Sequence, residues 1–165
     1  MPITPFPTLF AQAATAVQAA ADALRYLKAT SGDLQVYNLF NVWQAMQAAN
    51  GITTALMASA AADPTAATAA LPSFGGAPAT VADLQAGFQN IQAAAQAFNV
   101  AAAAWITANL TAADLLSIQP STVNGVSSQV MTWTDHIPAA KVDVLRADPT
   151  LAALIAAFEA IGATA

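Results

Sequence analysis

Apolar residues recur with helical spacing over most of this chain, and the clearest run follows residue 80. Its apolar positions step alternately by three and four residues: Val81, Leu84, Phe88, Ile91, Ala95, Phe98, Ala102 and Trp105. Such spacing places them on one face of a helix, as a heptad seam. Thr80 and Asp83 match the Ser/Thr-x-x-acid pattern of a capping box, which predicts where the helix begins. We therefore expect a long central helix with this seam in the core.

The opposite face of the same helix carries side-chain amides in place of charges. Its polar residues are Gln85, Gln89, Gln92, Gln96 and Asn99. A solvated helix ordinarily carries Glu–Lys pairs on such a face. Neutral amides are buried at a smaller free-energy cost than ions when they find hydrogen-bond partners. We therefore expect the four glutamines to lie at an interface with a partner subunit.

A similar seam predicts a first helix over residues 8–30, ended by Gly32, which suits the left-handed C-terminal cap. Its apolar positions follow the same heptad spacing: Phe10, Ala13, Val17, Ala20, Leu24 and Leu27. Residues 1–7 contain three prolines and are expected to form an extended N-terminal arm. The arm residues expected to contact a partner are Pro5, Phe6 and Pro7.

The next segment predicts two more helices. One is expected to begin at Asp33 as its N-cap and to stop at Asn50-Gly51, and a short helix follows over residues 52–62. Asp63-Pro64 combines an N-cap with a proline in the first turn, which predicts another helix start. Residues 71–79 contain two prolines and two glycines and predict the clearest break in the chain.

The least helical region lies between residues 119 and 138. Before it, Thr111 and Asp114 repeat the capping-box pattern and predict a short helical turn through residue 118. The region itself is rich in Ser, Thr and Val and contains Asn-Gly, so a packed loop and a short strand pair are both compatible with it. Trp133 lies in this irregular segment, and we expect it to contact a partner.

A final helix over residues 149–161 is predicted after Asp148, with Gly162 as its cap. Its apolar stripe comprises Leu151, Leu154, Ile155, Phe158 and Ile161. Much of the 57% hydrophobic content is alanine, which has the highest helix propensity and lets helices approach closely. The sequence thus predicts an all-α fold: a compact, Ala-rich bundle forming one domain over residues 8–165.

Charged residues are scarce, and this predicts a largely neutral protein surface. Charged residues make up 8% of the chain, against about a quarter in an average globular protein. No positive charge lies between Lys28 and Lys141. The acids in that interval fall at or near predicted helix starts: Asp33, Asp63, Asp83, Asp114 and Asp135. A neutral exterior of this kind favours a surface covered by other subunits.

Several classes of partner and location are disfavoured. Four cations and a net charge of −5 cannot form a basic track for nucleic acid. The best membrane-span candidate, residues 93–110, owes most of its apolar content to alanine and contains amides, so a buried helix is the better interpretation. Met1 is followed by prolines without a basic stretch, so no signal peptide is expected.

Candidate chemistry is sparse. His136, the only histidine, has Asp135 beside it and Asp143 nearby, but a metal or acid–base site needs several converging groups. Gly75-Gly76 lacks the lysine of a phosphate loop, and there are no cysteines. Trp105 lies on the central seam and is expected in the core. We therefore expect no catalytic, cofactor-binding or metal-binding residues.

These observations favour a non-enzymatic structural subunit that associates with copies of itself or with other subunits of one assembly. The candidates are a component of a phage or virus particle (head decoration, head–tail junction or tail) or of a filament, located in a virion or an extracellular assembly. The alternatives are an amphipathic coat protein of a lipid or polymer granule, which would want basic residues on its polar face, and a small ligand-binding helical domain.

Overall fold

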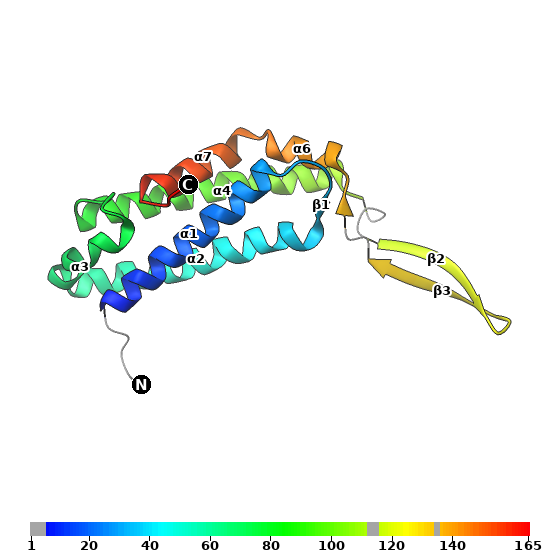
Figure 1. Cartoon of the computed structure of the whole chain (residues 1–165), viewed down its shortest axis with the longest axis horizontal. Helices are drawn as coiled ribbons and strands as arrows, with labels where there is room; N and C mark the ends of the chain where they lie inside the picture. The colour runs from blue at the N-terminus through cyan, green and yellow to red at the C-terminus, as the bar shows by residue number, and fades with distance from the viewer. Residues whose placement is uncertain (1–5, 112–115, 134–135) are drawn as a thin grey trace.

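The protein is a helical bundle from which a β-hairpin projects (Figure 1). The computed structural model describes residues 6–111, 116–133 and 136–165, and in the hairpin it describes the side chains of residues 120–129. The long helices are α1 (Phe6–Ala29), α2 (Val36–Ala62), α4 (Val81–Asn109) and α7 (Pro149–Ala160). Shorter elements are α3 (Pro64–Ala70), the 3₁₀ turn η1 (Leu71–Phe74) and α6 (Ala139–Arg146). The predicted all-α bundle is confirmed.

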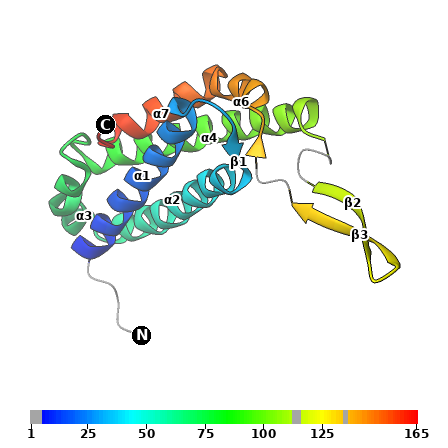
Figure 2. The same cartoon turned by 45° about the vertical axis from the view of Figure 1, so that its right-hand side comes forward.

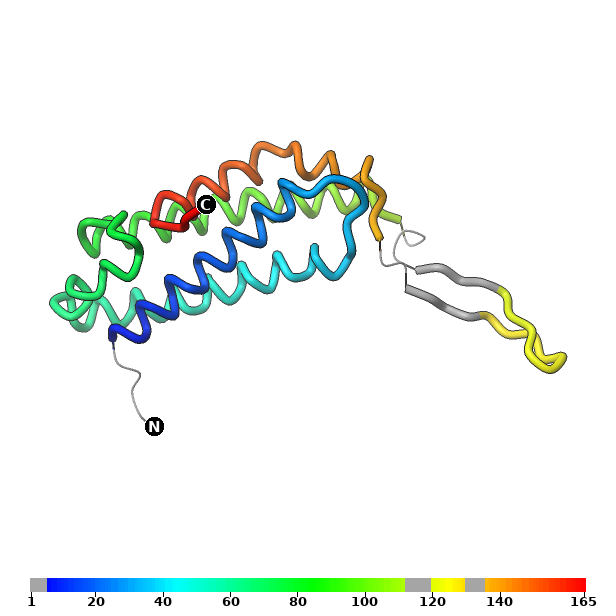
Figure 3. The backbone as a smooth tube through the Cα atoms, viewed as in Figure 1, coloured from blue at the N-terminus to red at the C-terminus, as the bar shows by residue number. Residues whose placement is uncertain are grey.

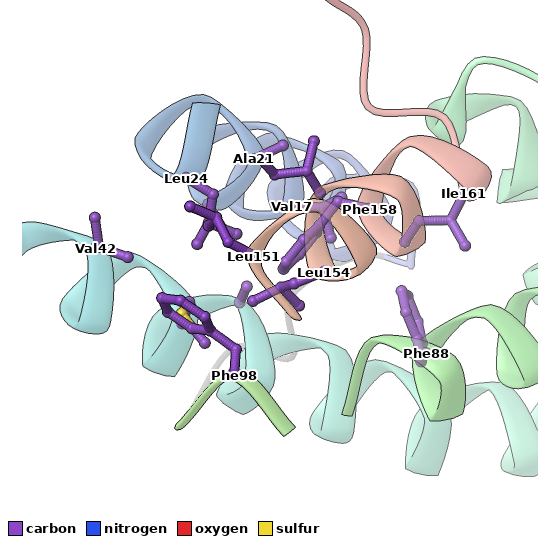
Figure 4. Packing of buried hydrophobic residues seen from close by; sticks show 14 of the residues in the cluster. Val17, Ala21, Leu24, Val42, Phe88, Phe98, Leu151, Leu154, Phe158 and Ile161 are labelled. Carbon is purple, nitrogen blue, oxygen red and sulfur yellow. The ribbon is translucent and has the colours of Figure 1, made fainter. Parts of the chain in front are cut away.

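Helix α1 lies at the centre of the bundle, against α2, α7 and η1. Every position of its predicted seam is buried. Figure 4 shows Val17, Ala21 and Leu24 of α1 facing the apolar stripe of α7. Because two of the six seam residues are alanine, the helices approach closely, and the large side chains of α7 fill the remaining space.

The central helix also follows the predicted pattern. Leu84, Phe88, Phe98 and Trp105 are buried, and the remaining large seam residues are partly buried. The capping box is present, with the Thr80 hydroxyl accepting from the Asp83 N–H at 3.1 Å and the Asp83 carboxylate accepting from the Thr80 N–H at 2.9 Å. The predicted core role of Trp105 is confirmed, and its indole N–H donates to a backbone carbonyl of α6.

Two predicted boundaries are wrong. Helix α1 already begins at Phe6, so Phe6 and Pro7 belong to its first turn and not to an extended arm. Proline is tolerated there because first-turn N–H groups have no partner within the helix. Helix α2 continues through Gly51 to Ala62 as one helix. Burial of its small residues on both sides of Gly51 stabilises the continuous helix more than one glycine weakens it.

Asp33 is a cap, but for a different helix from the one predicted. Two residues of strand β1 (Leu34–Gln35) separate it from α2. β1 pairs antiparallel with β4 (His136–Ile137), and this brings Asp33 to the start of α6. Its carboxylate accepts the Ala139 N–H at 2.9 Å, across 106 residues of sequence. Asp63 and Asp148 cap α3 and α7 as predicted, and Asp114 and Asp135 lie outside the described residues.

The irregular region forms a strand pair, one of the two structures compatible with its sequence. Strands β2 (Leu116–Val123) and β3 (Val126–Trp133) form an antiparallel hairpin around Asn124-Gly125. The helical turn predicted through residue 118 is wrong for residues 116–118, which belong to β2. Antiparallel pairing with β3 determines their conformation, and the local capping pattern does not. The hairpin stands away from the helices (Figures 2 and 3).

Candidate interaction surface

Nearly all charged side chains that the structure describes form hydrogen bonds or ion pairs within the protein. Nine acids occur in the chain, two lie outside the described residues, and each of the others caps a helix or accepts from an arginine. Arg25 bonds to Glu159 at 2.8 Å, joining α1 to α7. Arg146, which is 7% exposed, donates to the carbonyls of Leu27 and Gly32 just where α1 ends. The charges therefore fix helix ends, and few remain on the surface.

Two helices that contain almost no charge lie beside each other. The sequence contains no charged residue throughout α2, and in α4 the only one is Asp83, in the first turn. The fold brings these two helices together, and hydrogen bonds between their side chains connect them. We call the exposed residues of α2 and α4 the neutral face. Its exposed large apolar side chains are Tyr37, Phe40, Val100 and Ile106.

A groove of about 520 Å³ runs between α2 and α4 within the neutral face. Its floor reaches the bundle core, because Val17 of α1 and Phe158 of α7 contribute to the lining. Phe88 and Met46 add further apolar surface, and the described lining contains no charged side chain. Helix α2 packs closely against α1 and α4 packs closely against α7, whereas α2 and α4 contact each other sparsely, which leaves this space.

Amide side chains hold the two walls of the groove together. The Trp43 indole N–H donates to Asn99 at 3.1 Å, and Gln92 donates to Asn50 at 3.2 Å. The Trp43 ring also stacks on Phe98, with ring centroids 6.0 Å apart. The walls are thus fixed by polar bridges at the rim and by aromatic packing below.

The four predicted interface glutamines all lie on the exposed side of α4. Gln92 and Gln96 line the groove, whereas Gln85 and Gln89 lie nearer the start of the helix and do not. The structure thus places them together on one helix face. Their contact with a partner stays a prediction.

The other predicted interface residues do not share this surface. Phe6 is partly buried, packs on the core, and its ring lies 5.3 Å from that of Phe10. Pro7 is exposed in the first turn of α1. Pro5 and the side chain of Trp133 lie outside the described residues. Of this group, only Pro7 presents a described, exposed side chain.

Sequence reasoning missed the contribution of α2. The sequence predicts helices in this segment, but it does not identify Trp43, Asn50 and Thr53 as one wall of a groove. The available signal was the absence of charge from residues 36–62 together with large apolar residues on more than one side. That signal gives no information on which helix lies opposite.

Other candidate sites receive no support. His136 is exposed in β4, and within the described ranges no three His, Cys, Asp or Glu side chains converge as metal ligands. No helix in the part of the chain that is described combines the length and hydropathy of a membrane span.

Comparisons with protein-family models, with curated proteins and with solved structures found no match to this chain.

Proposed function

We propose that this protein is a non-enzymatic structural subunit of a large protein assembly, with a phage or virus particle component or a filament subunit as the candidate settings. The single observation that carries the proposal is the neutral face. Two long helices without charge, apart from Asp83, lie together, expose aromatic and aliphatic side chains and enclose an apolar groove. Interface cores are depleted in charge and enriched in aromatic residues.

The internal use of charge supports the same proposal. Arg25 and Arg146 and the described acids stabilise helix ends and interhelical contacts, so the fold does not rely on the neutral face for its electrostatics. That face is therefore free to associate. Large patches of exposed apolar surface on a monomer mark interaction sites.

Light scattering coupled to size exclusion, over a wide range of concentrations, tests the proposal. A mass that exceeds 16.7 kDa and rises with concentration is the expected result. A monomer at every concentration, including after removal of any purification tag, would count against self-assembly. Electron microscopy of the associated fraction would then separate a closed particle from a filament.

The groove favours a second candidate function, the binding of a small, neutral, apolar ligand. Its volume of about 520 Å³ falls within the range of ligand pockets, and amides at the rim offer orienting hydrogen bonds. Fluorescence of the neutral dye Nile red tests this function. Ala95→Phe, which fills the groove, should abolish saturable binding. Ala86→Phe on the same helix, outside the groove lining, should not.

A further inference from the structure

The turn of the hairpin determines which opposed residues of β2 and β3 are hydrogen-bonded to each other. Asn124 and Gly125 have φ values of 51° and 78°, as a two-residue type I′ turn requires. Val123 faces Val126 across the turn. In such a turn these flanking residues are hydrogen-bonded to each other, and bonded and non-bonded pairs alternate outward from them.

This alternation determines which backbone groups point toward the outer edges of the hairpin. Counting from Val123 and Val126, the opposed residues Pro120 and Gln129 form a non-bonded pair. The backbone groups of a non-bonded pair point away from the partner strand. The nitrogen of Pro120 therefore faces the outer edge of β2, and the proline removes no bond from the hairpin. What it removes is a donor from the β2 edge, which hinders further strands from pairing there.

The outer edge of β3 has no such block. No proline and no charged residue occurs from Val126 to Trp133. The described side chains of β3, from Val126 to Gln129, are all exposed, and Val126 at the tip is 67% exposed, so this outer part of the hairpin does not rest on the bundle. A two-stranded hairpin that packs against nothing is only marginally stable in water. Its open edge is a template for an added strand.

We propose that β3 pairs antiparallel with β3 of a second copy of this chain. The product is a four-stranded sheet in the order β2–β3–β3–β2. Two-fold antiparallel pairing is self-complementary, and no like charges oppose each other because the hairpin has none. Pro120 then lies on both outer edges, so pairing through this sheet stops at two copies. This inference deepens the proposed function and rests on it, because it names the contact by which two subunits join.

Two proline variants test the edge assignment. Gln129→Pro removes the outward N–H from the β3 edge and leaves the hairpin ladder intact, as Pro120 does natively in β2. Thr122→Pro is the matched control, because it removes an outward N–H from the edge of β2. In analytical ultracentrifugation we expect Gln129→Pro to raise the dimer dissociation constant at least tenfold. We expect Thr122→Pro to change it less than threefold. Equal effects of the two variants, or no effect of Gln129→Pro, would overturn the inference.

Spin labels give a readout that does not depend on hairpin stability. The chain has no cysteine, so single Ser128→Cys and Ser121→Cys variants label β3 and β2 specifically. Perpendicular to the strands of the proposed sheet, the two β3 labels lie one strand spacing apart and the two β2 labels three, which differ by about 10 Å in that direction. The shorter distance is expected for the Ser128 label. The reverse order would overturn the inference and leave self-assembly intact, whereas a wild-type protein that stays monomeric would overturn both.

Discussion

The indole N–H of Trp43 donates a 3.1 Å hydrogen bond to Asn99, and this bond joins α2 to α4 across the rim of the groove. The two residues are 56 positions apart in sequence. Direct packing between these helices is sparse compared with that between α1 and α2. Polar bridges therefore matter more here than elsewhere in the bundle, because they set the width of the groove where apolar packing does not.

Trp43→Phe should lower the free energy of unfolding by about 1 kcal/mol, because the hydrogen bond is lost while an aromatic ring remains to stack on Phe98. Urea denaturation measures the change. Asn99→Ala provides the double-mutant cycle, and the second substitution should cost less in the Trp43→Phe background than in the native chain. Additive losses would show that the bond contributes nothing to stability.

Charge introduced on the neutral face should weaken association without unfolding the protein. Combined Gln89→Glu and Gln96→Glu substitutions place carboxylates on exposed positions of α4, where an interface would have to desolvate them. We expect the apparent dissociation constant to rise at least tenfold and the free energy of unfolding to change by less than about 0.5 kcal/mol. Gln12→Glu, on the exposed side of α1, is the matched control. Unchanged association of the double variant would mean that this part of α4 is solvated.

Two glycines should respond in opposite directions to alanine. Gly162 has φ of 111°, and a Cβ there would lie 2.0 Å from the carbonyl oxygen of Phe74. Gly162→Ala should therefore lower the free energy of unfolding by about 3 kcal/mol. Gly51 lies within α2 with nothing near its missing Cβ, so Gly51→Ala should raise stability by about 0.5–1 kcal/mol. Thermal and urea unfolding compare the two, and a loss of stability in Gly51→Ala would contradict the continuous α2 helix.

Asp33→Ala should destabilise the protein by about 1 kcal/mol, because the first N–H of α6 loses its acceptor. Asp33→Asn keeps a side-chain oxygen and should recover most of the loss. Hydrogen exchange locates the effect, and faster exchange is expected at Ala139 and in the following turn of α6. Faster exchange confined to the start of α2 would instead support the cap predicted from the sequence.

Helices with a regular spacing of apolar residues were predictable from the sequence alone. The seam of α1 and the stripe of α7 are buried, and the seam from Val81 to Trp105 is buried or packs against the core, because a single apolar face is removed from water by packing against other helices. Caps whose donors lie within the next few residues, at Asp63, Thr80 and Asp148, were also predictable. The scarcity of charge was readable as well, since it is a property of composition.

Which helices and strands contact each other became known only from the tertiary structure. The position of Asp33 in the sequence predicts a cap for the helix that follows it, but pairing of β1 with β4 places it at the start of α6. Residues 116–118 follow a capping-box pattern, yet they form a strand paired with β3. The scarcity of charge in α2 and α4 can be read from the sequence. The groove arises because these two helices lie beside each other without packing tightly. Local pattern fixes which face of a helix is apolar, whereas the partner of that face depends on contacts between residues far apart in the chain, which no short window of sequence contains.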